Sequence, residues 1–322
     1  MNKLKHILVA GGAGFIGTNL CERLLDLDYK ILCIDNLSTG KLENASRFGS
    51  FENYTFLEAD ITEDISDIIP KDIDCIINLA CQASPLAYYQ HPIETLLTSV
   101  IGVRNLLNIA KELNIPIIQS STSEVYGDPE IPILDEFYNG NVSCIGPRAC
   151  YDEGKRAAET LCIDYHRIYG VNVKLIRIFN TYGPYMQIND GRAIPAFIDK
   201  ALKNETIVIN GDGTQTRSFQ YIDDLIDAIV KLMDDAVSFN YPVNVGNPNE
   251  EFSIRELANI VISLTGSSSD IKCVERLPDD PRKRRPSIRR IRDLIDWSPK
   301  VTLSEGLKRT IEFFKDRDSF CC

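Results

Sequence analysis

A tyrosine and a lysine stand four residues apart within a predicted helix, where side chains of that spacing share one face. They are Tyr151 and Lys155, and the helix is predicted over residues 151–169. A lysine ammonium beside a phenol favours the phenolate and lowers its pKa. The pair therefore predicts a general base that removes a proton from an alcohol.

Hydroxyl side chains follow a predicted strand over residues 116–120. Ligands of open α/β sheets bind at the carboxyl ends of the strands, so Thr122 or Ser123 could hold the oxygen that the tyrosine deprotonates. A turn or helix-cap role is the alternative for either residue alone.

A glycine-rich segment indicates a dinucleotide site. Gly11, Gly14 and Gly17 lie between a predicted strand at 6–10 and a helix, and Asp35 ends the next strand 18 residues after Gly17. Glycines let backbone N–H groups approach a pyrophosphate, and a carboxylate at that strand end binds ribose hydroxyls and repels a 2′-phosphate. The pattern predicts a site for NAD rather than NADP. The alternative is that the glycines form a simple turn and that Asp35 only caps it.

These residues require a sheet to position them. Apolar strand-like runs alternate with helical patterns through the first half of the chain, which indicates a parallel sheet covered on both faces. After residue 183 the pattern changes, and we expect a discontinuous second domain. The predicted domains are 1–182 plus 218–246 and 183–217 plus 247–322. Strands are predicted at 30–34, 54–59, 75–80, 173–179, 206–210 and 242–246, and helices at 92–113, 193–203 and 219–234.

Composition excludes several classes of protein. The 322 residues are 44% hydrophobic and 25% charged, which is ordinary for a globular protein and too apolar for a disordered one. No run approaches the ~20 apolar residues of a membrane span. The net charge of −11 argues against a nucleic-acid binder. Ten cysteines without a CxxC pair, and no signal-peptide core, predict a reduced, cytoplasmic protein.

The chain resembles the extended short-chain dehydrogenase/reductase family, and within it the UDP-glucuronate decarboxylases. The resemblance covers nearly all of residues 6–315. It rests on segments that follow one another in order: GGAGFIG (11–17), STSEVYGDPE (121–130), GPRACYDEGKR (146–156), RIFNTYGP (177–184), NDGR (189–192) and QTRSFQY (215–221).

The resemblance implies a Rossmann-type, doubly wound α/β sheet with a smaller α/β substrate domain. It implies that NAD oxidises C4 of UDP-glucuronate, that the 4-keto sugar loses CO₂, and that returning the hydride gives UDP-xylose. In this scheme Tyr151 is the C4 base, Lys155 tunes it and holds the nicotinamide ribose, and Thr122 hydrogen-bonds O4.

The resemblance also implies the remaining site residues. Ser123, Glu124 and Arg284 complete the catalytic set, and no metal is expected. The UDP-sugar is expected at Tyr88, Asn180, Arg192, Gln215, Arg217 and Arg284. NAD is expected at Gly11, Gly14, Phe15, Ile16, Gly17, Asp35, Asn36, Ser38, Thr39, Gly40, Asp60, Ile61, Leu79, Ala80, Thr98, Tyr151 and Lys155.

The pair Ser123-Glu124 separates the chain from related enzymes. The 4,6-dehydratases carry Asp-Glu here, and simple 4-epimerases usually lack the glutamate. Glu124 beside a carboxylate substrate would be protonated or would expel CO₂ by repulsion. Arg284 could bind that carboxylate or hold the group that protonates C5. Other readings are release of a UDP-4-keto-pentose, 4-epimerisation, or a non-catalytic scaffold or redox sensor.

Two departures from the family pattern lie near the expected site. Leu97 replaces a usual lysine, and Cys81-Gln82 replaces a usual Ser-Pro. Seven of the eleven residues from 282 to 292 are Lys or Arg, which could mark a nucleic-acid patch, but the family match favours an anion site at Arg284. By analogy, the helices near 92–113 and 151–169 form a four-helix bundle in a homodimer.

Overall fold

A seven-stranded parallel sheet forms the centre of the computed structural model, which describes residues 5–234, 239–275 and 284–319. All neighbouring strands in it run parallel. The predicted Rossmann-type α/β fold is therefore confirmed. In spatial order the strands are β11 (Val243–Val245), β6 (Val173–Ile178), β5 (Ile117–Thr122), β4 (Cys75–Asn78), β1 (His6–Ala10), β2 (Lys30–Asp35) and β3 (Tyr54–Glu58).

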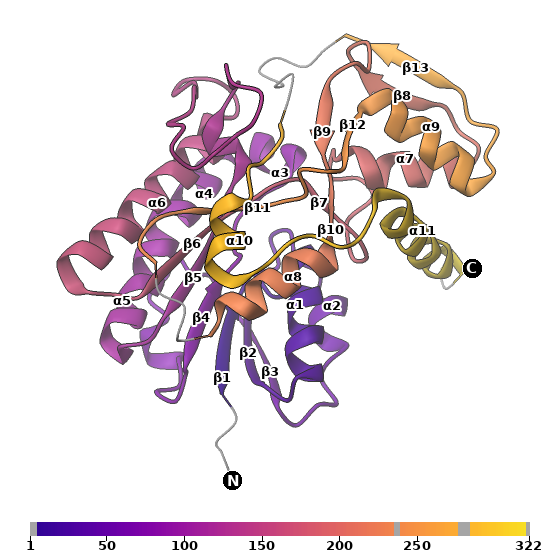
Figure 1. The fold of residues 1–322 in the computed structure, drawn as a ribbon. Helices are drawn as coiled ribbons and strands as arrows, with labels where there is room; N and C mark the ends of the chain where they lie inside the picture. Colours follow the sequence, from indigo (N-terminus) through magenta and orange to yellow (C-terminus); the bar gives the residue numbers. More distant parts are fainter. Residues whose placement is uncertain (1–4, 235–238, 276–283, 320–322) are drawn as a thin grey trace.

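Helices cover both faces of this sheet (Figure 1). On one face lie α4 (Pro92–Leu97), α5 (Val103–Leu113) and α6 (Ala149–Tyr169), and on the other lie α1 (Phe15–Asp26) and α8 (Ile222–Leu232). The short α2 (Leu42–Ser46), η1 (Ser66–Ile68) and α3 (Pro85–Gln90) follow β2, β3 and β4 in the chain.

The apolar run of β1 shows why the strands lack alternation. Ile7 and Val9 pack into the core on the side of α1 and α8, whereas Leu8 and Ala10 pack into the core on the side of α5 and α6. Both faces of a parallel sheet are buried, so apolar residues occupy successive positions from Ile7 to Ala10 instead of alternating with polar ones. The sheet is a rigid base for the loops at its carboxyl edge.

A smaller lobe stands beside the carboxyl edge of the sheet (Figure 1). The lobe is built from two separate stretches of chain. Strands β8 and β9, at 207–218, pair with β13 and β12, at 251–274, respectively. The helix α10 (Arg289–Ile295) instead contacts β11 of the large sheet. The domain boundaries themselves stay a prediction. The lobe comprises α7 (Ala193–Leu202), β8 (Ile207–Asn210), β9 (Thr216–Ser218), β12 (Glu251–Ser253), α9 (Ile254–Thr265), β13 (Ile271–Val274) and α11 (Leu303–Ser319).

Two predicted helices are wrong in detail. The helix expected over 92–113 is interrupted by a π-helical turn, η2 (Thr98–Gly102), where Ile61 lies so close that a Cβ on Gly102 would stand 2.6 Å from it. The helix expected over 219–234 begins at Ile222, because β10 (Gln220–Tyr221) first pairs with β7 (Thr181–Tyr182). A 3-10 helix, η3 (Ser123–Tyr126), follows β5.

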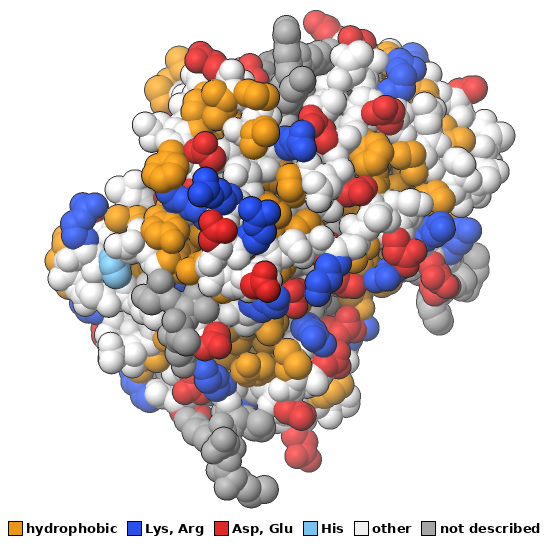
Figure 2. All heavy atoms as spheres, in the orientation of Figure 1, with side chains coloured by type: hydrophobic (Ala, Val, Ile, Leu, Met, Phe, Trp, Pro, Cys, Tyr) orange, Lys and Arg blue, Asp and Glu red, His pale blue; other side chains and the backbone are white. Residues whose placement is uncertain are grey.

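The surface carries mixed charge on the face that bears α10. Figure 2 shows acidic and basic side chains interspersed there. Four arginines of the basic run form ion pairs: Arg284 with Glu124, Arg285 with Glu251, Arg289 with Asp293 and Arg290 with Glu136. Arg282 and Lys283 lie outside the described residues.

The cysteines and the helices give two further facts. Eight cysteines of the described ranges are free thiols, and Cys321 and Cys322 lie outside those ranges. Within the same ranges, every helix is too short or too polar to cross a bilayer.

Candidate active site

A cavity of about 550 Å³ opens between the carboxyl ends of the strands and the smaller lobe. A narrower groove, which we call the nucleotide groove, adjoins it and shares Leu79 and Cys81 with it. Predicted residues lining the cavity are Phe15, Ile16, Leu79, Tyr88, Thr122, Ser123, Glu124, Tyr151, Lys155, Asn180, Arg192, Gln215, Arg217 and Arg284. Predicted residues lining the groove are Gly11, Gly14, Asp35, Asn36, Ser38, Thr39, Asp60, Ile61, Leu79, Ala80 and Thr98.

Gly17 and Gly40 are not among these lining residues, and the structure gives each a packing reason. A Cβ on Gly17 would stand 2.2 Å from the backbone oxygen of Gly11. A Cβ on Gly40 would stand 2.7 Å from the Asp35 carboxylate. Both glycines therefore allow the loop to close tightly around the groove.

The glycine loop fits a dinucleotide. Gly11 has φ +79°, and a Cβ there would lie 2.7 Å from the backbone nitrogen of Ala80. The helix α1 begins at Gly14 without a capping side chain, so its first N–H groups face the end of the loop. This is the arrangement in which a pyrophosphate binds to backbone N–H groups and the helix dipole.

Asp35 lies where the prediction placed it, at the end of β2. Its carboxylate accepts from the backbone N–H groups of Ala13 at 3.0 Å and Leu37 at 2.9 Å. Burial raises the pKa of Asp35, and these two hydrogen bonds oppose the rise. Asp60 both lines the groove and caps the following turn, accepting from the Thr62 N–H at 2.8 Å. The cap on this turn is thus observed, and the contact of Asp60 with NAD stays a prediction.

Tyr151 and Lys155 share one face of α6, and both are buried. The Lys155 ammonium donates to the backbone oxygen of Ser120 at 3.1 Å and lies 6.0 Å from the centre of the Tyr151 ring. Thr122 hydrogen-bonds Tyr151 and also caps η3, its hydroxyl accepting from the Glu124 N–H at 3.2 Å. Thr122 is therefore both a partner of the tyrosine and a helix cap.

The expected lowering of the Tyr151 pKa is contradicted. Burial raises this pKa well above its usual value, Cys81 and Glu124 add to the rise, and only the Thr122 hydrogen bond lowers it. The physical reason is that the Lys155 charge is directed at Ser120, whereas the anionic Glu124 stands in the same cavity. Burial therefore favours the protonated form of Tyr151.

Glu124 stands between two arginines. It accepts from both terminal nitrogens of Arg284 and from one of Arg148. Burial alone would raise the pKa of Glu124, but Arg284 and Arg148 outweigh it and hold the pKa at about 2. Of the two states left open by the sequence, the structure therefore favours the ionised carboxylate.

Arg148 is a cavity residue that the sequence reasoning missed. It lies inside the GPRACYDEGKR segment, three residues before Tyr151, and its guanidinium stands 5.9 Å from the centre of the Tyr88 ring. Tyr88 in turn stacks on Tyr151, with ring centres 5.3 Å apart and planes 10° apart. Its place in the GPRACYDEGKR segment was the signal from which the sequence could have predicted it as a site residue.

Asp152 adds a second carboxyl group behind Arg148, with its Oδ2 3.8 Å from the Arg148 Nε. Burial raises the pKa of Asp152 to about 7, the charge of Glu124 adds to the rise, and Arg148 opposes it. Arg148 is thus shared between two carboxyl groups, of which Glu124 holds the negative charge.

Four residues predicted to bind the UDP-sugar reach the cavity from two parts of the fold, since Asn180 follows β6 and the other three lie at the start of α7 and on or next to β9. Arg217 on β9 is buried, and Gln215 follows a turn in which Gly211 and Gly213 both have positive φ. Arg192 pairs with Asp190 and lies 5.5 Å from the centre of the Phe15 ring. Asn180 contributes its backbone oxygen to the Gln220 N–H at 2.9 Å.

Leu97 and Cys81, the two departures from the family pattern, lie in different parts of the structure. Leu97 is 41% exposed on α4 and is absent from the lining of both cavity and groove. Cys81 lines both, and its thiol lies 3.5 Å from the Ser99 hydroxyl. Leu97 therefore lies outside the expected substrate region, whereas Cys81 lies inside it.

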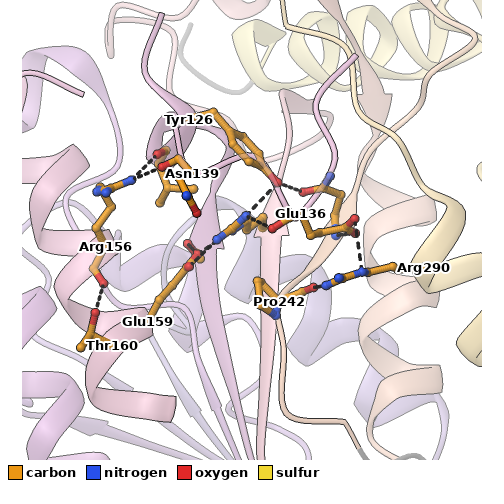
Figure 3. A network of polar contacts seen from close by, with 12 residues as sticks. Tyr126, Glu136, Asn139, Arg156, Glu159, Thr160, Pro242 and Arg290 are labelled. Carbon is orange, nitrogen blue, oxygen red and sulfur yellow. Dashed lines mark hydrogen bonds and ion pairs between the residues drawn. The ribbon is translucent and has the colours of Figure 1, made fainter. Parts of the chain in front are cut away.

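A polar network behind the cavity holds the catalytic strand end in place (Figure 3). Glu159 on α6 accepts from the Ser121 hydroxyl at 2.5 Å and is bound through both oxygens by Arg177. Arg177 also donates to the Tyr126 hydroxyl, which donates to Asn244 on β11. The network ties β5, β6, α6 and β11 together directly beside Thr122.

Comparisons with known proteins agree with this architecture. A family model described as the NAD dependent epimerase/dehydratase family matches residues 7–246. The chain belongs to this family. NAD is the cofactor that family membership assigns, and the glycine loop and nucleotide groove fit it.

Within the family, the chain is similar to curated UDP-glucuronic acid decarboxylases. UDP-glucuronic acid decarboxylase 3 of Arabidopsis thaliana is 45% identical over 313 residues, covering 97% of this chain and 90% of that protein. UDP-glucuronic acid decarboxylase 1 of Danio rerio is 44% identical over 310 residues, covering 96% and 72%.

A solved structure of another family member is also similar. The UDP-glucuronic acid 4-epimerase of Bacillus cereus, in complex with UDP-glucuronic acid and NAD, is 28% identical with a TM-score of 0.85, covering 97% of this chain and 99% of that one.

Proposed function

We propose that the protein is an NAD-dependent UDP-glucuronate decarboxylase that produces UDP-xylose. The observation that carries the proposal is the ion-paired set of Glu124, Arg148 and Arg284 beside Thr122 and Tyr151 in one cavity. An epimerase has no need to act on the C6 carboxylate, whereas a decarboxylase must place charged groups around it. The similarity to curated decarboxylases supports the same choice.

Bound NAD⁺ would accept the hydride that leaves C4 of the sugar and return it after the loss of CO₂, and its positive charge would favour the phenolate form of Tyr151. Thr122 orients the substrate O4, and Tyr151 takes its proton as C4 becomes a ketone. Lys155 donates a hydrogen bond to the backbone oxygen of Ser120, which fixes its ammonium group beside Tyr151. Tyr151 acts as the phenolate, becomes a phenol when it takes this proton, and returns the proton to O4 at the end, so the phenolate is regenerated.

Loss of CO₂ needs a ketone at C4, because the electrons of the C5–C6 bond pass into the C4 carbonyl and leave an enolate. Arg148 and Arg284 position the C6 carboxylate, and the ionised Glu124 repels it. Proton transfer to C5 then completes the exchange of CO₂ for H. Arg284 would hold the group that donates this proton to C5. It would not donate the proton itself, since the pKa of an arginine exceeds ~12.

Three UDP-sugars are distinguishable by proton NMR after incubation with UDP-glucuronate and NAD⁺. UDP-xylose without accumulated NADH supports the proposal. UDP-galacturonate would identify an epimerase, and a UDP-4-keto-pentose with NADH would identify an enzyme that stops early. Unchanged UDP-glucuronate would overturn the proposal.

We further propose a homodimer formed through α4, α5 and α6. Ile93 is 68% exposed, Leu96 40% and Leu97 41%, and together they make an apolar stripe on α4 beside α6. A second copy of the same helices would cover this stripe and build a four-helix bundle. The free thiols support a reducing compartment, and we place the enzyme in the cytoplasm.

A further inference from the structure

Gln82 is a buried polar residue at the edge of the nucleotide groove that the mechanism above does not use. It lies four residues beyond the last residue of β4 and is 5% exposed. Its Nε2 donates to the Ser38 hydroxyl at 3.4 Å, but its Oε1 has no hydrogen-bond partner within the described part of the chain. Buried polar atoms are almost always hydrogen-bonded, so this oxygen is open to a donor that enters the groove.

The other amide of the groove differs from Gln82. Asn36 donates to Asp60 at 2.7 Å and accepts from the Ser38 N–H at 3.0 Å, so both ends of its amide are engaged. Asn36 is held by the protein alone, whereas Gln82 has an acceptor to spare. The asymmetry points to a ligand contact at Gln82.

We infer that Gln82 binds the adenosine ribose of NAD through its side-chain amide, an inference that rests on NAD being the cofactor. Phosphate oxygens only accept hydrogen bonds, whereas ribose hydroxyls also donate. Gln82 lines the groove together with Asp35 and Ser38, and it is not among the residues lining the cavity of Tyr151. Its donor therefore belongs to the adenosine half of NAD, and the hydrogen bond from Gln82 to Ser38, close after Asp35 in the chain, points to a ribose hydroxyl rather than to the adenine amino group.

The inference gives Gln82 a role that a proline could not fill. The side chain of proline has no hydrogen-bonding group, so a proline at this position would leave the groove without this acceptor. In this chain, Asp35 and Gln82 both supply acceptors beside Ser38. We expect this arrangement to tighten NAD binding by one hydrogen bond.

Calorimetric titration with NAD⁺ tests the inference without turnover. Gln82→Met keeps the length of the side chain and removes the amide, and it should bind NAD⁺ about 3- to 10-fold more weakly, the range of one neutral hydrogen bond. Gln82→Pro should show the same loss and serves if the methionine variant fails to fold. Gln90→Met, at an exposed glutamine outside the groove, should bind like the wild type.

The same titration with 2′-deoxy- and 3′-deoxyadenosine analogues of NAD⁺ locates the contact. For one analogue, wild type and Gln82→Met should bind equally, because the partner hydroxyl is already missing. Unchanged NAD⁺ affinity in both Gln82 variants, or an equal loss with NAD⁺ and both analogues, would overturn the ribose contact. Failure of the wild type to bind NAD⁺ would instead overturn the cofactor assignment itself.

Discussion

Glu124 accepts hydrogen bonds from both terminal nitrogens of Arg284, a residue 160 positions later in the chain. The pair joins the end of β5 to the segment that precedes α10. Paired fork to fork, the two groups are held in one geometry, and the Glu124 carboxylate stays ionised down to about pH 2. A permanent negative charge in the cavity is what repulsion of the C6 carboxylate requires.

Replacing Glu124 should remove that charge and take the carboxylate partner away from Arg284, whereas Arg148 keeps Asp152. For Glu124→Gln we expect kcat for UDP-xylose to fall by about 10²–10³-fold. Breaking a buried ion pair from one side should also cost about 3–5 kcal/mol of stability. The control is Glu153→Gln, because Glu153 pairs with Arg156 at 3.6 Å on the outer part of α6. Equal kcat values in the two variants, measured in a coupled CO₂ assay, would contradict the role of Glu124.

Stability should depend on pH through two carboxyl groups with opposite shifts. Folding lowers the pKa of Glu124 to about 2, so its contribution is present above its ordinary pKa and is lost as pH falls through about 2. Folding raises the pKa of Asp152 to about 7, so its contribution is present at low pH and is lost as pH rises through about 7.

Asp152→Asn isolates the second group. The variant should gain stability relative to the wild type between pH 5 and pH 8, by at most ~4 kcal/mol for a shift of this size. Urea unfolding at several pH values measures the difference. A stability difference that does not change with pH would show that Asp152 titrates normally.

Tyr151→Phe should stop the reaction at its first step, because the O4 proton then has no acceptor. We expect turnover to fall by at least ~10³-fold while NAD⁺ binding persists, since the phenyl ring still stacks on Tyr88. Tyr165→Phe is the control, because the Tyr165 hydroxyl donates to Asn108 on α5 at 2.8 Å and does not line the cavity. Retained activity in Tyr151→Phe would remove the tyrosine from the mechanism.

A methyl group at Gly11 should block the cofactor. Gly11→Ala places a Cβ 2.7 Å from the Ala80 nitrogen at φ +79°, whereas Gly170→Ala imposes a similar φ of +74° with nothing within 4 Å. Both variants should lose about 1 kcal/mol to backbone strain. Only Gly11→Ala should lose NAD⁺ affinity in calorimetry, and equal affinities would show that the loop is not the pyrophosphate site.

The proposed dimer predicts a change of mass. Ile93→Glu puts a charge into the apolar stripe of α4 and should yield monomers in light scattering. Ile145→Glu alters an isoleucine that is 92% exposed in a loop, and it should leave the mass unchanged. A wild type that is already monomeric, or an Ile93→Glu variant that stays dimeric, would contradict the proposed interface.

The sequence predicted the large sheet well, because buried parallel strands leave long apolar runs. β1 was predicted at residues 6–10 and lies at His6–Ala10. β7, β9, β10 and β12 went unpredicted, because these strands of two or three residues are too short for a periodic signal and contain mostly polar or aromatic residues, unlike the equally short β11. The π-helical turn at Thr98–Gly102 was missed because its residues still fit a helical pattern.

The sequence predicted which residues form the site but not which of them carry a charge. Motifs identified Tyr151 and Glu124, yet their protonation states depend on burial and on partners distant in the chain. Arg148 was passed over because a motif does not state which of its members face the cavity. Gln82 registered only as a departure, since an unpartnered amide is visible only in three dimensions.

The most direct test of the account follows the C6 carbon. UDP-glucuronate labelled with ¹³C at C6 is incubated with the enzyme and NAD⁺, and the label is followed by NMR. The account predicts one labelled CO₂ or bicarbonate for each UDP-xylose formed, with no net production of NADH. Label that remains in a UDP-sugar after turnover would contradict decarboxylation and with it the assigned roles of Glu124, Arg148 and Arg284.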